Sequence, residues 1–157
     1  MDEFEEALLD ISENNLNAVS KKHNDIDTKA IGIITISGIL ITFLTSSFTT
    51  SKSYVSSILL FLTLLSFFIT VFFCIVVLRP RKAHTPSTLY LIEQLKDEDK
   101  NVQISRILQT HAEIEDELQD ICTDKASWLD KAVRTLGISV ILLIIYNIIK
   151  GITTIRP

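Results

Sequence analysis

Residues 54–78 read YVSSILLFLTLLSFFITVFFCIVVL, twenty-five consecutive positions without an acidic or basic side chain. The next four residues, Arg79, Pro80, Arg81 and Lys82, carry three positive charges. A helix rises about 1.5 Å per residue, so this stretch would reach about 37 Å and cross a hydrocarbon core of about 30 Å. A chain of 157 residues built around so long an uncharged helix is predicted to be a membrane protein.

Two other apolar blocks predict further spanning helices. Residues 30–48 carry no charge and include six isoleucines, and residues 132–149 carry one charge, on Arg134. Each would measure about 27 Å as a helix, close to the thickness of the hydrocarbon core. For the last block, a helix half-buried in one leaflet is the alternative to a third crossing. The chain has only four glycines and three prolines, so we predict an all-α membrane protein with three transmembrane helices.

The charged parts of the chain show helical periodicity with a mixed stripe. Between residues 2 and 22 the stripe consists of Phe4, Leu8, Ile11, Asn15, Ala18 and Lys22. Between residues 104 and 132 it consists of Ile104, Leu108, His111, Glu115, Leu118, Cys122, Lys125, Leu129 and Ala132. A shorter stripe is formed by Leu89, Ile92 and Leu95, and residues 23–29 form a polar joint before the first span. Because the two long stripes share a heptad period, these amphipathic helices are predicted to pair in a cytoplasmic helical bundle.

These patterns divide the chain into five predicted segments. They are a cytoplasmic amphipathic helix at 1–28, transmembrane helices at 29–49, 54–78 and 132–150, and a cytoplasmic helical region at 79–131. With the N-terminus in the cytoplasm, nine lysines and arginines flank the spans on the inner side and three on the outer side. Such an excess marks the cytoplasmic side, so we predict a multi-pass protein with a cytoplasmic N-terminus. The acidic first residues are unlike the basic start of a cleavable signal peptide.

Motifs of enzymatic or metal chemistry are missing from the sequence. It has no phosphate-cradling glycine loop, no nucleophile elbow and no histidine–carboxylate spacing typical of zinc sites. The histidines His23, His84 and His111 lie on three different segments, and Cys74 and Cys122 have no neighbours spaced for metal binding. We predict a protein that is not an enzyme, uses no cofactor or metal, keeps its cysteines as packed thiols and binds no nucleic-acid polymer.

Basic residues gather where the spans are predicted to meet the inner interface, and we call Lys29, Arg79 and Arg81 the basic collar. One interpretation is anchoring on anionic lipid, worth about 1 kcal/mol per base. The other is a ligand-binding site, because clustered guanidinium groups can hold a phosphate through paired hydrogen bonds. Asp27 lies two residues before Lys29 and is predicted to form a structural polar pair with Arg79, with Arg81 as the alternative partner.

The first and third spans also echo each other at an offset of 102 residues. Lys29-Ala30-Ile31 followed by Ile36-Ser37 matches Lys131-Ala132-Val133 followed by Ile138-Ser139. Two helices that enter an apolar layer from a basic end can produce such a match by chance. Chance is therefore one interpretation of the match, and an internal repeat is the other.

Three short motifs carry a resemblance to a known family. Asp27-Thr28-Lys29-Ala30 opens the first span, Leu78-Arg79-Pro80-Arg81 closes the second, and Lys125-Ala126-Ser127-Trp128-Leu129-Asp130-Lys131-Ala132 leads into the third. In order and spacing the chain resembles the transmembrane effectors of Pycsar antiphage systems, and it is similar to the SLATT group of small membrane effectors as a second choice. The Pycsar resemblance implies a prokaryotic inner-membrane protein that works beside a nucleotide cyclase, responds to cyclic CMP or cyclic UMP, and damages the membrane. The chain lacks a recognisable cyclic-nucleotide-binding domain, so the basic collar is the only part we propose for the phosphate.

Two functions therefore compete. The first is a membrane effector that forms homo-oligomers in the lipid bilayer and impairs it, with hydroxyl-bearing side chains lining a pore. Those side chains are Thr35, Ser37, Thr42 and Thr45 in the first span, and Thr63, Ser66 and Thr70 in the second. The alternative is a non-enzymatic scaffold or adaptor that recruits a cytosolic partner through its helical bundle.

Overall fold

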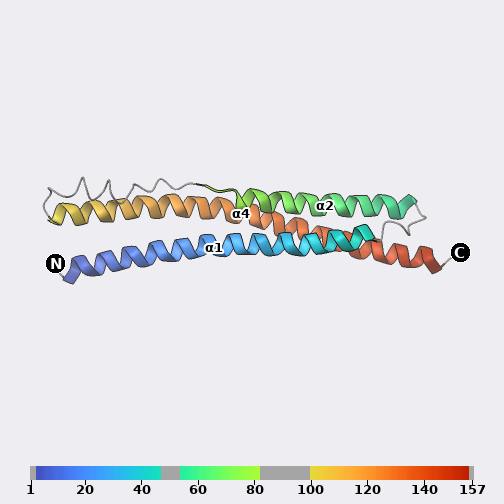
Figure 1. Cartoon of the computed structure of the whole chain (residues 1–157), viewed down its shortest axis with the longest axis horizontal. Coiled ribbons are helices and arrows are strands. Elements are labelled where there is room, and N and C mark those ends of the chain that lie inside the picture. Colours follow the sequence, from blue (N-terminus) through green and yellow to red (C-terminus); the bar gives the residue numbers. More distant parts are fainter. Residues whose placement is uncertain (1–2, 47–53, 82–99, 156–157) are drawn as a thin grey trace. The chain divides into compact units, whose positions relative to one another are not determined.

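The computed structural model describes residues 3–46, 54–81 and 100–155, and all statements below concern these residues. They form three helices, α1 (Glu3–Ser46), α2 (Tyr54–Leu78) and α4 (Lys100–Ile155), and no strand occurs among them (Figure 1). Each helix contains a stretch long and apolar enough to cross a membrane. The predicted class, an all-α membrane protein with three spanning helices, is confirmed.

Contacts divide the chain into two units, to which α1 and α4 both contribute. We call Met1–Asp25 with Pro80–Asp124 the amphipathic unit, and Ile26–Arg79 with Lys125–Pro157 the spanning unit. The stripe at Leu89, Ile92 and Leu95 lies outside the described residues. Each unit is described by itself.

The helix bounds follow from where the sequence has helix-breaking residues. The polar joint at residues 23–29 is helical, because no glycine or proline precedes Gly32 and nothing there interrupts the backbone hydrogen bonds. Helix α2 ends at Leu78, two residues before Pro80. Proline disfavours helical geometry in the residue before it, and the Arg79 amide closes the last turn by donating to the Val76 carbonyl at 3.4 Å.

The core of the spanning unit repeats every seven residues in all three helices. In α2 the buried residues alternate in steps of four and three: Ser56, Leu60, Thr63, Phe67, Thr70, Cys74 and Val77. In α1 they include Ala30, Ser37 and Leu44, and in α4 they include Lys125, Ala132, Ser139 and Tyr146. This is the spacing of helices that wind around one another with interlocking side chains.

Contacts within the spanning unit also fix the direction of its helices. The start of the α4 span meets α1 at Asp27, and further along both helices Leu44 and Tyr146 belong to one buried cluster. The α1 and α4 spans are therefore parallel. Helix α2 is antiparallel to them, because Phe73 near its end stacks on Trp128 while Leu60 near its start packs in the cluster with Tyr146.

Large apolar side chains cover the outside of the spanning unit. Ile39, Phe61, Phe68, Phe72 and Ile141 are each more than half exposed. Large apolar side chains on the outer surface of a bundle are the arrangement expected of helices surrounded by lipid.

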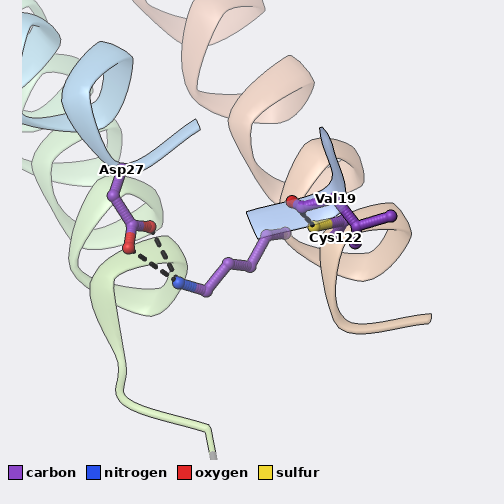
Figure 2. A network of polar contacts seen from close by, with 4 residues as sticks. Val19, Asp27 and Cys122 are labelled. Atoms are coloured by element: carbon purple, nitrogen blue, oxygen red, sulfur yellow. Dashed lines mark hydrogen bonds and ion pairs between the residues drawn. The ribbon is translucent and has the colours of Figure 1, made fainter. Parts of the chain in front are cut away.

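In the amphipathic unit, hydrogen bonds join α1 to α4. Ser12 Oγ of α1 is hydrogen-bonded to His111 Nδ1 of α4 at 2.9 Å. Further along the same two helices, the Cys122 thiol donates to the Val19 carbonyl, with 3.9 Å between sulfur and oxygen (Figure 2). Both α4 residues lie on the heptad stripe of that segment, whereas Ser12 and Val19 each lie one residue after a stripe residue of α1.

Candidate functional site

A buried ion pair joins α1 and α4 at one end of the spanning unit. Lys125 Nζ donates to both carboxylate oxygens of Asp27, at 2.8 and 3.0 Å (Figure 2). The lysine side chain is 2% exposed and the aspartate side chain 27% exposed. A buried ammonium is tolerated only when it is paired and hydrogen-bonded, so this contact holds the two helices together where their spans begin.

Lys125 is a site residue that the sequence reasoning missed. It was counted as a polar interruption of the heptad stripe, although a lysine at a buried heptad position needs a carboxylate partner. Asp27 is the acid that lies closest to the first span. Its position next to the span is therefore the signal in the sequence that could have indicated a pair with Lys125. The predicted Asp27–Arg79 pair stays a prediction.

The basic collar is distributed over both units. Lys29 and Arg79 belong to the spanning unit and are exposed, as is Arg81, which belongs to the amphipathic unit. There the Arg81 guanidinium forms an ion pair with the carboxylate of Asp124. A phosphate that bound Arg81 would therefore compete with a carboxylate that this chain itself supplies.

Hydroxyl groups follow the buried face of the spanning unit, and we call Ser37, Ser56, Thr63, Thr70, Ser139 and Tyr146 the polar seam. Each of these side chains is at most 1% exposed. Thr63 donates to the Leu59 carbonyl at 2.7 Å, and Thr70 and Ser139 make equivalent bonds within their own helices. The hydroxyls of Ser37, Ser56 and Tyr146 are buried without a hydrogen-bond partner among the described residues. Unpaired buried hydroxyls are costly, and in lipid no bulk water relieves them.

The hydroxyl groups predicted to line a pore fall into two sets in the structure. Ser37, Thr63 and Thr70 lie inside the bundle of a single chain, with Ser66 half-buried beside them. Thr35, Thr42 and Thr45 are exposed on α1, and each donates to a carbonyl three or four residues earlier in its own helix. One face of α1 therefore points polar groups into the bundle and another points them away from it.

Two of the outward-pointing threonines, Thr35 and Thr42, belong to a regular face of α1. Thr28, Gly32, Thr35, Ile39, Thr42 and Ser46 are all exposed and recur in steps of four and three, and we call them the small-residue face. A methyl group added at Gly32 would meet no atom within 4 Å. Packing within the chain therefore does not require glycine at this position.

The amphipathic unit has a groove of about 210 Å³ between its two helices, lined by Leu8, Ile11, Ser12, Asn15, Leu108, Ala112 and Glu115. Ser12 in this lining is the residue bonded to His111, and Glu115 follows one turn after that histidine. The groove thus combines apolar walls with a few polar groups, which suits a side chain of a partner better than a charged small molecule.

Metal chemistry finds no support in the described residues. Among them, no three histidine, cysteine, aspartate or glutamate side chains are grouped closely enough to hold a metal ion. Cys74 and Cys122 are both buried and form no disulfide, and one lies in each unit.

Comparison with known proteins gives one match. The family model of the Pycsar effector protein domain matches residues 11–149, which include α2, the Lys125–Asp27 pair and the whole polar seam. No curated protein and no solved structure matches the chain.

Proposed function

The chain belongs to the Pycsar effector family, and we propose that it impairs the inner membrane of a prokaryotic cell as a homo-oligomer once a cyclic nucleotide signals infection. Family membership makes it a membrane effector of a cyclic-nucleotide antiphage system. The observation that carries the proposal is the family match over 11–149 on a chain whose three helices each have a membrane-spanning length.

Assembly of several copies is supported by the small-residue face of α1. In lipid the hydrophobic effect does not drive helices together, so they associate through close packing of small and hydroxylated side chains. Thr35 and Thr42 satisfy their hydroxyls within α1, which lets this face lie against lipid or against another helix. A second copy is the partner that this face fits best.

The chain acts in this proposal without catalysing a reaction. Among the described residues, the polar clusters within each unit include ion pairs, a serine–histidine bond and a seam of hydroxyls, and none of these combines a nucleophile with an oriented base and an anion-stabilising group. The cyclic nucleotide, cyclic CMP or cyclic UMP, is the signal and is made elsewhere.

The experiment uses the full-length protein in vesicles of phosphatidylethanolamine and phosphatidylglycerol that contain a fluorescent dye. We expect addition of cyclic CMP or cyclic UMP to collapse an imposed membrane potential, while cyclic AMP serves as the control nucleotide. Cross-linking before and after addition reports the copy number. Vesicles that hold their potential with every nucleotide, while the protein is inserted and folded, would contradict the proposal.

We propose the basic collar as the region that contacts the ligand, because it carries three positive charges. Arg81→Ala should weaken nucleotide binding by removing a guanidinium. Asp124→Asn should strengthen it, because Arg81 then loses its competing carboxylate. Equal binding by the two variants and the wild type would remove Arg81 from the site.

A scaffold or adaptor remains the second candidate, and the groove of the amphipathic unit is the observation in its favour. In that case the chain would bind a soluble protein at fixed stoichiometry, and cells with high expression would keep their membrane potential. Ala112→Trp, which fills the groove, would then abolish the complex without changing membrane insertion.

A further inference from the structure

The polar seam is unusual because its hydroxyl groups lie where apolar groups would pack equally well. Close approach of helices requires small side chains, and alanine meets that requirement without leaving a hydroxyl unpaired. Ser37 and Ser56 nevertheless each keep a buried hydroxyl that has no hydrogen-bond partner within the part of the chain that the structure describes. Thr63 and Thr70 donate to their own helix, and each oxygen can still accept a hydrogen bond. The seam therefore has unused capacity for a small polar ligand, and water is the ligand that fits groups of this kind.

The hydroxyls are spaced along the direction in which the helices cross the membrane. In α2, Ser56, Thr63 and Thr70 follow at intervals of seven residues, about 10 Å each along the helix axis. Ser37 and Ser139 lie at buried positions of the two flanking helices. A series of hydroxyls with this spacing can support a single file of water molecules, in which each molecule bonds to a hydroxyl or to its neighbour.

An apolar cluster interrupts the series, and we call Leu44, Leu60, Phe67 and the aromatic ring of Tyr146 the plug. Only the hydroxyl group of Tyr146 belongs to the polar seam. These four residues are buried together, with contributions from all three helices. On α2 the plug residues Leu60 and Phe67 lie on either side of Thr63, so Ser56 and Thr70 are at opposite ends of it. Hydrophobic constrictions close channels by excluding water.

We propose that the polar seam is a proton path through a single chain, and that the plug keeps it closed in the structure described here. When the plug opens, water fills the seam and protons pass along it by exchange between neighbouring water molecules and hydroxyls. No bond other than O–H is made or broken, and the membrane potential drives the net movement. The inference rests on the proposed membrane-impairing function and gives it a route that admits protons but excludes larger solutes.

The first experiment opens the plug without any nucleotide. Full-length Phe67→Ala is reconstituted in phosphatidylethanolamine–phosphatidylglycerol vesicles containing a pH-sensitive dye, and a potassium gradient with valinomycin sets the potential. We expect proton entry several-fold faster than with the wild type. Phe68→Ala is the matched control, because the adjacent ring is 59% exposed whereas Phe67 is fully buried. Phe67→Leu leaves a smaller cavity than Phe67→Ala and should give an intermediate rate of proton entry. If the alanine variant folds poorly, the leucine variant can be compared with the control instead.

The second experiment removes the seam hydroxyls while keeping the side-chain volume. Thr63→Val with Thr70→Val, added to Phe67→Ala, should return proton entry to the rate of the Phe68→Ala control. The matched pair is Thr45→Val with Thr135→Val in the same Phe67→Ala background, because these two hydroxyls lie outside the seam and bond to their own helices. That pair should leave the fast rate unchanged.

Two results would overturn the proton path. One is equal proton entry with Phe67→Ala, Phe67→Leu and Phe68→Ala, and the other is a fast rate that survives loss of both seam threonines. Either would reduce the seam to packing residues only. Neither result depends on the nucleotide. A wild-type protein that fails to respond to cyclic CMP or cyclic UMP would therefore contradict the proposed function, and the test of the proton path would still apply.

Discussion

The pair formed by Asp27 and Lys125 shows how much one contact depends on its surroundings. Lys125 is 2% exposed, so its ammonium has no access to water if the carboxylate is removed. Asp27 is 27% exposed, so its carboxylate keeps partial hydration if the lysine is removed. The two single substitutions should therefore differ in cost even though they break the same bond.

We expect Asp27→Asn to lower the free energy of unfolding by about 3 kcal/mol or more, because it leaves a buried charge unpaired. Lys125→Met should cost less, and Asp27→Leu combined with Lys125→Met should recover most of the loss. The measurement is chemical unfolding in detergent, followed by circular dichroism.

The exposed pair between Asp130 and Arg134 provides the control for that measurement. Its side chains are 55% and 77% exposed and are joined at 2.8 Å within one helix. Asp130→Asn should change stability by less than about 0.5 kcal/mol. A double variant at Asp27 and Lys125 that is as unstable as Asp27→Asn alone would show that the site is held by something other than the charge pair.

At the scale of the helices, the sequence predicted well that spanning helices exist in this chain. It predicted less well which side chains pair between those helices. The absence of charge between Tyr54 and Leu78 fixed the extent of α2, because lipid penalises any buried charge and proline ends the helix. Which side chains meet across helices depends on register, and a slip of one residue turns a different face inward. For that reason the sequence did not single out Lys125 as a partner of Asp27, which is the contact that the structure shows between α1 and α4.

The echo between the first and third spans has a structural counterpart. Ala30, Ser37 and Leu44 on α1 and Ala132, Ser139 and Tyr146 on α4 are all buried, and each pair is separated by 102 residues. The two parallel helices thus bury equivalent positions in the core of the spanning unit. A small residue followed by serine and then a large side chain is a packing solution that the chain uses twice.

Substitutions of the exposed glycines in the spans test the role of the outer surface of these helices. Gly32 on α1 and Gly137 on α4 are exposed, and an added methyl group would meet nothing within 4 Å in either case. Within one chain, Gly→Ala should stabilise each helix by about 0.5–1 kcal/mol, because alanine loses less backbone entropy. We expect both variants to unfold at higher denaturant concentration in a detergent that keeps the chain monomeric.

Oligomers should separate the two glycine variants. Gly32 lies on the small-residue face and Gly137 does not, so Gly32→Ala should reduce cross-linking between copies in vesicles while Gly137→Ala should preserve it. Equal cross-linking by both variants would show that copies do not meet through this face of α1.

At the scale of the whole molecule, the number of crossings and the charge distribution together determine which parts of the chain reach which side. Three crossings place the two termini on opposite sides, and two crossings with a half-buried last helix place them on the same side. The basic residues favour a cytoplasmic N-terminus, nine against three. Composition alone does not distinguish these arrangements, because the span in α4 is continuous with a long charged segment of the same helix.

We expect green fluorescent protein to fluoresce when fused to the N-terminus, since it folds in the cytoplasm. Alkaline phosphatase, which needs the oxidising exterior, should be active when fused after residue 50 and also after residue 157. Activity at the first position with none at the second would establish a half-buried last helix. Replacing Lys29, Arg79, Arg81 and Lys82 with glutamine should shift part of the population to the opposite orientation, because these residues supply nearly half of the inner positive charge. If that variant keeps one orientation, the acidic amphipathic unit, and not the basic collar, resists translocation, and the collar is then free to serve ligand binding.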